Sequence, residues 1–332
     1  MHETRRGFCA TLGRGLLATS VWSALPAPAY ANARTVRVAA QATGTLAWEL
    51  DVALAHKLPE KYGLRLDIVR LATPEAQKIA LKGGSANVIV ADWLWVALER
   101  SLGGDLLFHP FSSALGSLMA PAQSRVRVLS DLRGRKLGVA GGPLDKSWAM
   151  LRALALREGV DLRREADVVF GAPPLLAQKA RQGELDAVLI YWNFAAELEA
   201  AGLRVVITMQ DVQSRLGAKG SVALIGYVFK DSWASREPET ATRFLAMGRE
   251  AKQILLTSDA EWRRLAPLIR ASDDAALSAL RDRYREGVPM RAPADEWRDA
   301  GKLLSAMAES IGQDAVAGVK TLDRRMFYEP GA

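Results

Sequence analysis

Two stretches decide the fold of this chain: LSDLRGRKLGVAGGPLDKSWAML (129–151) and GELDAVLIYWNFAAELEAAG (183–202). Each has a short apolar run typical of a buried strand, then small, polar and aromatic residues, then a helical pattern. Open α/β sheets are built from strands that lead directly into helices, and they bind ligands at the carboxyl ends of those strands. The two stretches therefore predict a parallel sheet and the place of a ligand site.

Strand-like and helix-like runs alternate along the rest of the chain in the same way. The first series has expected strands over 35–40, 65–71, 87–91 and 106–111, with helices over 46–62, 74–82 and 92–102. The second has strands over 136–140, 167–170, 187–191 and 203–207, with helices over 145–158, 173–182 and 193–201. A strand over 222–229 then returns to the first series, and the chain from 238 onward is almost wholly helical.

This order predicts an α/β fold of two lobes, each a mainly parallel sheet flanked by helices. We expect 34–117 and 224–332 to form the first lobe and 118–223 the second. The chain then crosses between lobes twice, near 112–120 and 220–226, and two such crossings make a hinge.

Residues 1–33 have the three regions of an export signal. Arg5 and Arg6 form a charged start, an apolar run covers 16–25, and Ala31-Asn32-Ala33 fits a cleavage site. We therefore expect cleavage after Ala33 and a periplasmic protein. The paired arginines favour the twin-arginine route, while the general export route stays open.

Composition narrows the function classes further. Cys9 is the only cysteine, so the mature chain has none for disulfides, thiolate catalysis or metal binding. The net charge of +7 falls to about +5 when three arginines and one glutamate leave with 1–33, a dispersed surplus that does not indicate nucleic acid binding. Beyond the signal no run approaches eighteen apolar residues, so no further membrane span is expected.

Ligand contacts are expected where strands end and helices begin. The candidate residues are Gln41, Thr43, Thr45, Asp92, Trp93 and Ser113 in the first lobe, and Gly142, Asp145, Lys146, Ser147, Trp148, Tyr191, Trp192 and Asn193 in the second.

Two kinds of ligand remain open at this point. The Gly141-Gly142 turn before a helix, with Lys146 beside it, can hold an anion such as a sulfonate or carboxylate, although it equally reads as a tight turn with Asp145 as helix cap. Alternatively, Asp92 with the neighbouring indole and phenol rings can hold a cation or a flat organic molecule. The glycine spacing excludes a P-loop.

Several segments resemble periplasmic solute-binding proteins of the nitrate, sulfonate, taurine and thiamine-precursor class. They are LPEKYGLRLDIVRL, IALKGGSANVIVADW, SDLRGRKLGVAGG, GELDAVLIYW and ALIGYVFKDSWASREPETATRFL, in that order. Asn87 stands where that family usually has aspartate. The resemblance implies the type II periplasmic binding fold and a role in feeding a small molecule to an ABC permease.

The sequence therefore predicts a monomeric substrate-binding component of an ABC importer, without catalytic residues, metal or cofactor. The captured solute is of sulfonate, carboxylate or amine type. The alternative is an enzyme on the same fold, similar to pyrimidine synthases or chorismate-processing enzymes. Such an enzyme needs a positioned acid, base or nucleophile, and Asp92 with Tyr191 is the only pair that the sequence suggests.

Overall fold

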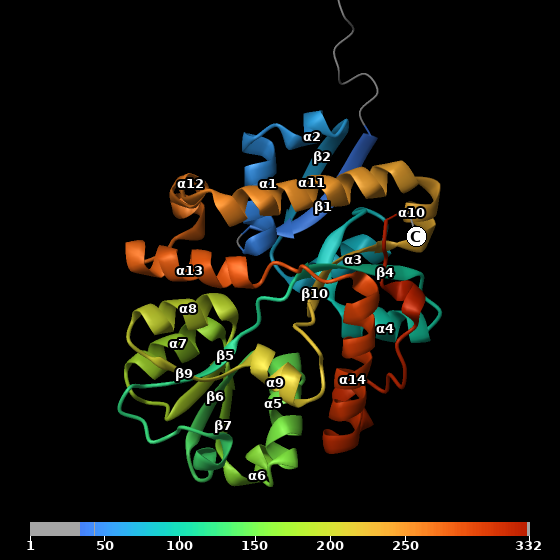
Figure 1. The fold of residues 1–332 in the computed structure, drawn as a ribbon. Helices are drawn as coiled ribbons and strands as arrows, with labels where there is room; N and C mark the ends of the chain where they lie inside the picture. Colours follow the sequence, from blue (N-terminus) through green and yellow to red (C-terminus); the bar gives the residue numbers. More distant parts are fainter. Residues whose placement is uncertain (1–33, 43, 331–332) are drawn as a thin grey trace, which may run out of the picture.

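The computed structural model describes residues 34–42 and 44–330, and in it the chain forms two lobes (Figure 1). The upper lobe in this view contains a parallel pair of strands, β1–β2, and an antiparallel sheet in the order β3-β10-β4. A parallel bridge between Val38 and Val88 joins the pair to the sheet. The strands are β1 (Arg34–Gln41), β2 (Leu64–Leu71), β3 (Ile89–Asp92), β4 (Leu106–Ser112) and β10 (Ile225–Lys230).

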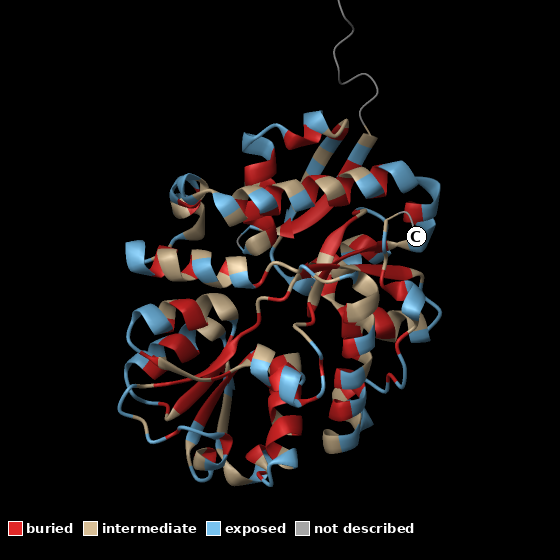
Figure 2. Cartoon of the chain, in the orientation of Figure 1, coloured by how far each residue is buried: buried red, intermediate tan, exposed pale blue. Residues whose placement is uncertain are grey.

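The lower lobe is built on one sheet in the order β7-β6-β8-β5-β9. β6 pairs in parallel with both β7 and β8, whereas β5 is antiparallel to its neighbours β8 and β9. The strands are β5 (Ser117–Ala120), β6 (Lys136–Ala140), β7 (Asp167–Gly171), β8 (Ala187–Ile190) and β9 (Arg204–Thr208). Figure 2 shows the inner strands β5, β6 and β8 largely buried, whereas the edge strands β7 and β9 are mostly half-buried or exposed.

Helices cover both sheets, and their starts carry the expected signals. Pro74 opens α3 with Thr73 as its cap, because proline suits the first helical turn and the threonine oxygen accepts an amide hydrogen bond there. With the upper lobe lie α1 (Thr45–Ala55), α2 (Leu58–Lys61), α3 (Pro74–Lys82), α4 (Trp93–Ser101), α10 (Asp231–Arg236), α11 (Pro238–Thr257), α12 (Asp259–Ile269) and α13 (Asp274–Glu286). With the lower lobe lie η1 (Leu129–Leu132), α5 (Lys146–Arg157), α6 (Leu162–Glu165), α7 (Pro173–Arg181), α8 (Trp192–Ala200) and α9 (Met209–Arg215).

The chain passes between the two sheets twice. Residues 113–116 connect β4 to β5, and residues 216–224 connect α9 to β10. The α/β class and the two-lobed arrangement predicted from the sequence are confirmed. The lobe boundaries stay a prediction.

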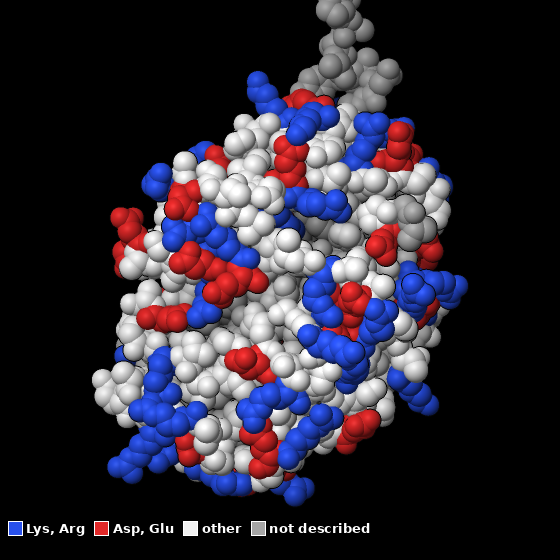
Figure 3. Space-filling model, viewed as in Figure 1, with Lys and Arg blue, Asp and Glu red and all other residues white. Residues whose placement is uncertain are grey.

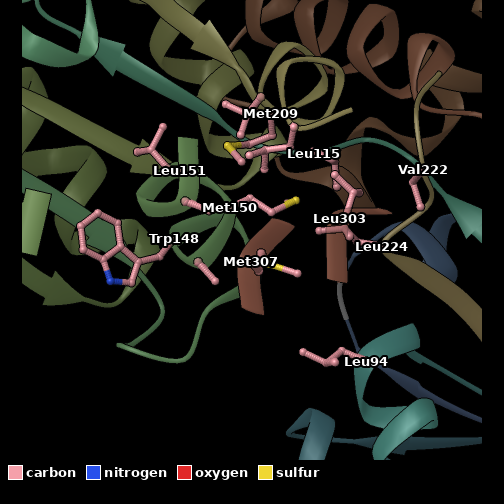
Figure 4. Close-up of a cluster of buried hydrophobic side chains, with 14 of the residues drawn as sticks. Leu94, Leu115, Trp148, Met150, Leu151, Met209, Val222, Leu224, Leu303 and Met307 are labelled. Carbon is pink, nitrogen blue, oxygen red and sulfur yellow. The ribbon is translucent and has the colours of Figure 1, made fainter. Parts of the chain in front are cut away.

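The C-terminal helix α14 (Pro293–Ile311) extends from the upper lobe onto the lower one, where it packs on α5. Leu303 and Met307 of this helix are buried in the same apolar cluster as Met150 and Leu151 of α5 (Figure 4). Two short helices follow, η2 (Gln313–Val316) and η3 (Arg324–Met326). The end of the chain thus returns to the upper lobe, where the backbone N–H of Tyr328 donates to Phe108. A segment that the sequence placed wholly in the first lobe therefore contacts both lobes.

α14 also holds the second crossing segment. The backbone N–H of Ala223 donates to Oε2 of Glu296 at 2.8 Å, and that of Lys219 donates to Oδ2 of Asp299 at 2.9 Å. Glu296 is fully buried, and its Oε1 has no hydrogen-bond partner. Burial raises the pKa of Glu296 to about 7, although the bond from Ala223 and the charge of Arg291 act in the opposite direction. One of the two crossing segments is thus held by a carboxyl group whose pKa burial raises to about 7.

Charged side chains are interspersed over the face seen in Figure 3. Lysine and arginine lie next to aspartate and glutamate there. A nucleic acid backbone would find no continuous basic track on this face.

Glu296→Gln should make the protein more stable at pH 8 and change its stability little at pH 5. The pKa of Glu296 in the folded state is raised to about 7 from 4.5. The stabilisation of the folded state by the protonated carboxyl group is therefore full below pH 4.5 and is lost as the pH rises through 7. At pH 8 the free energy of unfolding of Glu296→Gln should exceed that of the wild type by on the order of 2 kcal/mol. Calorimetric unfolding of both proteins at both pH values measures this difference. Glu309→Gln, on an exposed side chain of the same helix, is the control, and an effect of Glu296→Gln that does not depend on pH contradicts the assignment.

Candidate functional site

A cavity of about 520 Å³ lies between the two sheets and is lined from both. It is bounded by the carboxyl ends of β1, β3, β4 and β8 and by the starts of α1, α3, α5 and α8. Candidate residues from the sequence that line it are Gln41, Thr45, Asp92, Asp145, Lys146, Ser147, Tyr191, Trp192 and Asn193. Nine of the candidate residues thus line one cavity, and their contact with a ligand stays a prediction.

Four other candidate residues are not among those that line the cavity. Trp93 and Trp148 are 1% and 2% exposed and belong to the apolar core, where Trp148 packs edge-on against Phe170 at 6.0 Å. Ser113 is buried, and its hydroxyl donates to the carbonyl oxygen of Gly287 at 3.2 Å. Gly142 also lies outside the lining, and Thr43 lies outside the described residues.

Trp93 and Trp148 are both turned into the apolar core. Trp93 directly follows the capping Asp92, and successive helical residues point about 100° apart, so its indole faces the core while the carboxylate faces the cavity. Trp148 lies three residues after Asp145, and its ring packs against Phe170 of β7. The cage of Asp92 and aromatic rings, one of the two alternatives that the sequence left open, therefore lacks the indoles of Trp93 and Trp148.

The chain's own aspartates occupy two helix starts at the cavity. Oδ1 of Asp92 accepts the backbone N–H of Trp95 at 2.9 Å at the start of α4. Oδ1 of Asp145 accepts those of Ser147 at 2.9 Å and Trp148 at 3.1 Å at the start of α5. These N–H groups carry the positive end of the helix dipole, so the capping carboxylates fill the places where an anion would otherwise bind.

Asp92 also forms an ion pair across the cavity. Nζ of Lys146, at the start of α5, lies 3.2 Å from Oδ2 of Asp92 at the end of β3. The side chains are 32% and 13% exposed, so the pair is only partly screened by water. It connects one lobe to the other, and it engages the lysine that the sequence offered to an anionic ligand.

Asp145 makes a second, weaker contact on its cavity side. The hydroxyl of Tyr191 donates to Oδ2 of Asp145 at 3.3 Å. Burial raises the pKa of Asp145, and burial followed by the nearby carboxylate raises that of Tyr191. Gly141 permits this approach: its φ is +86°, and a Cβ there would lie 2.7 Å from the Tyr191 hydroxyl. Tyr191 therefore contacts Asp145, not Asp92 as the sequence suggested.

Aromatic rings form another part of the cavity wall. Trp192 lines it and packs edge-on against Trp48 at 5.9 Å, and Phe111 lines it from the end of β4. Behind Phe111, the ammonium group of Lys252 lies 3.7 Å from the ring centroid. This wall gives a bound solute an apolar surface.

Lys252 belongs to a buried cluster that supports this wall. Its Nζ donates to Oε1 of Glu49 at 2.5 Å, and the hydroxyl of Tyr284 donates to the same oxygen at 2.8 Å. Tyr227 donates to Oε2 of Glu49 at 3.3 Å. Burial raises the pKa of Glu49 and lowers that of Lys252, while each charge opposes the effect on the other. The cluster ties α1, α11, α13 and β10 together behind the cavity.

The sequence-based list missed residues that the structure adds to the lining. Glu75 and Lys78 come from α3, and Phe111 and Ser112 from the end of β4. The start of α3 follows β2 just as the starts of α1 and α4 follow β1 and β3. The candidate residues include positions after β1 and β3 but none after β2. The same rule of strand ends and helix starts, applied to β2, would have found the start of α3.

Other chemistry-bearing residues lie away from the cavity. His56 pairs with Glu261 at 3.0 Å, and His109 is hydrogen-bonded through Nδ1 to the carbonyl oxygen of Tyr328. Within residues 34–42 and 44–330, no group of three or more metal-ligating side chains is found, and no helix is long and apolar enough to cross a membrane.

Residues 55–260 match the family described as NMT1/THI5 like. The chain belongs to this family. The resemblance identified in the sequence is thereby confirmed. No match was found among curated proteins.

Solved structures share the fold of this NMT1/THI5-like chain. The periplasmic aliphatic sulphonate binding protein SsuA from Escherichia coli superposes with a TM-score of 0.70 at 18% identity, over 90% of this chain and 92% of that one. The alkanesulfonate-binding protein SsuA from Xanthomonas axonopodis pv. citri, bound to MOPS, has a TM-score of 0.61 at 18% identity, over 89% and 97%. The desulfurization enzyme DSZB has a TM-score of 0.57 at 14% identity, over 85% and 96%.

Lys146→Met should widen the separation of the lobes in the unliganded protein, because it removes the ion pair with Asp92. A partly exposed pair contributes about 0.2–1 kcal/mol, enough to shift an open–closed equilibrium up to about fivefold. Residues 34–332 contain no cysteine, so in a protein of these residues spin labels at Ser101→Cys and Arg164→Cys report one interlobe distance by pulsed electron resonance.

The control for this experiment is Lys82→Met, which removes an ion pair of 2.9 Å to Glu99 within the upper lobe. It should leave the interlobe distance distribution unchanged. If Lys146→Met also leaves the distribution unchanged, the Asp92–Lys146 pair does not hold the lobes together.

Proposed function

We propose that this protein is the substrate-binding component of an ABC importer and captures a small organic solute between its lobes. The observation that carries the proposal is the cavity of about 520 Å³, which lies between two sheets joined by two crossing segments. In such an arrangement a solute that contacts both lobes stabilises the closed form. Membership of the NMT1/THI5-like family and the shared fold with sulfonate-binding SsuA proteins support the same role.

The polar groups of the cavity favour binding over catalysis. Asp92 is engaged by a helix start and by Lys146, and Asp145 by a helix start and Tyr191. A general acid or base needs a proton-accepting or proton-donating group beside the reacting atom. Both oxygens of Asp92 are already engaged, and Oδ1 of Asp145 is held by the helix start. Only Oδ2 of Asp145, 3.3 Å from the Tyr191 hydroxyl, is left for a ligand.

The same proposal covers location and partners. An export signal over 1–33 with paired arginines would send the chain through the twin-arginine route to the periplasm, with cleavage after Ala33. There a monomer would deliver its solute to an inner-membrane permease. This signal lies outside the described residues.

A second candidate function is an enzyme on the same fold. The likeness to the desulfurization enzyme DSZB favours keeping it, because it shows that this architecture also carries catalysis. An enzyme would consume its ligand, whereas a binding protein returns it unchanged.

A thermal-shift screen of the mature protein should find a solute that raises the unfolding temperature. At one hundred times its dissociation constant, a solute adds about 2.7 kcal/mol to the stability of the folded state. The library should span sulfonates, carboxylates, amines and neutral pyrimidines, and mass spectrometry after incubation should recover the bound solute intact.

Trp192→Ala is the loss-of-binding variant, because it removes a ring from the cavity wall. Trp297→Ala is its matched control, because the Trp297 ring is hydrogen-bonded to Leu322 and does not line the cavity. We compare the unfolding temperature of each variant with and without solute. We expect Trp192→Ala to abolish the rise caused by the solute and Trp297→Ala to retain it. Conversion of the solute to a product contradicts the transport role and supports the enzyme.

A further inference from the structure

The charges that line the cavity do not suit a simple anion. Three lining side chains are acidic, Glu75, Asp92 and Asp145, and two are basic, Lys78 and Lys146. No arginine is among the cavity residues in the described part of the chain. Lys146 is paired with Asp92 at 3.2 Å, and the ammonium of Lys78 lies 5.1 Å from the ring centroid of Trp95. The lining side chains therefore carry a formal net charge of −1. Both lysines already have partners.

The two carboxylate oxygens of Asp145 differ in how well they are hydrogen-bonded. Oδ1 accepts two backbone N–H groups at 2.9 and 3.1 Å, whereas Oδ2 accepts only the Tyr191 hydroxyl at 3.3 Å, a long distance for an O–H···O bond. A partly buried carboxylate with an under-used oxygen gains strongly from a cationic donor, because charge-assisted hydrogen bonds are about twice as strong as neutral ones.

We propose that Asp145, with the rings of Tyr191 and Trp192, forms a subsite for a protonated amine on the captured solute. The ammonium group donates to Oδ2 of Asp145, and the rings of Tyr191 and Trp192 supply cation–π and apolar contact. Tyr191 and Trp192 both line the cavity, and Tyr191 is 36% exposed and therefore accessible. This inference rests on the proposed binding function and narrows its ligand class.

An anion at the same place would be disfavoured for two reasons. It would compete with Asp145 for the N–H groups at the start of α5, and it would lie beside that carboxylate. Two like charges brought close in a partly buried site repel each other strongly. The starts of α1 and α8 have no capping side chain, so the test includes an anionic series.

The test is a calorimetric comparison of probes that share a skeleton but differ in charge. Benzylamine, benzyl alcohol and benzenesulfonate form one series, and butylamine, butanol and butanesulfonate the other. The wild-type protein should bind the amine of each series at least about tenfold more tightly than the sulfonate. Asp145→Asn should weaken amine binding about tenfold and leave alcohol binding within about twofold, since asparagine retains the cap but loses the charge.

Two further variants separate the carboxylate from the rings. Tyr191→Phe keeps the ring and should retain amine binding, whereas Tyr191→Ala should weaken it severalfold. Asp273→Asn is the matched control, because Asp273 caps α13 through the backbone N–H of Ala276 and does not line the cavity. It should leave all affinities unchanged.

The outcomes distinguish this subsite from the wider proposal. If the sulfonates bind as tightly as the amines or more tightly, or if Asp145→Asn does not discriminate between amine and alcohol, the amine subsite is wrong while the binding role stands. If none of the amines binds, the subsite is also wrong, and the thermal-shift screen alone decides whether the protein binds a solute.

Discussion

Two helices that begin at the cavity are each N-capped by an aspartate, and the charge of the site depends on these two caps. A helix start needs hydrogen-bond acceptors, and Asp92 and Asp145 provide them for α4 and α5. Once the caps are formed, the positive ends of both dipoles are neutralised. The remaining charges of the cavity then follow: Lys146 pairs with the free oxygen of Asp92, and the second oxygen of Asp145 faces Tyr191.

The lobes are connected by more than the two crossing segments. α13 packs on α8, and Arg283 pairs with Glu199 at 2.6 Å between them. Tyr284, the next residue of α13, donates to the buried Glu49 behind the cavity wall. On the other side α14 packs on α5 and holds the segment 216–224. A change in lobe separation must therefore move α13 and α14 as well as the crossing segments.

The alternation of strands and helices was readable from the sequence because local patterns determine it. The turn GGPLDKS predicted a helix start with Asp145 as its cap, and this is what forms. The directions of Trp93 and Trp148 were not readable by the same reasoning, because composition at a junction does not give the helical phase that turns these rings to the core. Nothing local indicates that Asp92 meets Lys146, since that contact depends on how two lobes are placed.

A crystal structure of the protein with the tightest-binding solute from the screen would test the binding site most directly. We expect electron density between the lobes, in contact with the starts of α1, α5 and α8, with the solute's amine within hydrogen-bond distance of Oδ2 of Asp145. Density outside this cavity would contradict the binding role assigned to it. Density inside it with an acidic group against Asp145 would contradict the charge assignment.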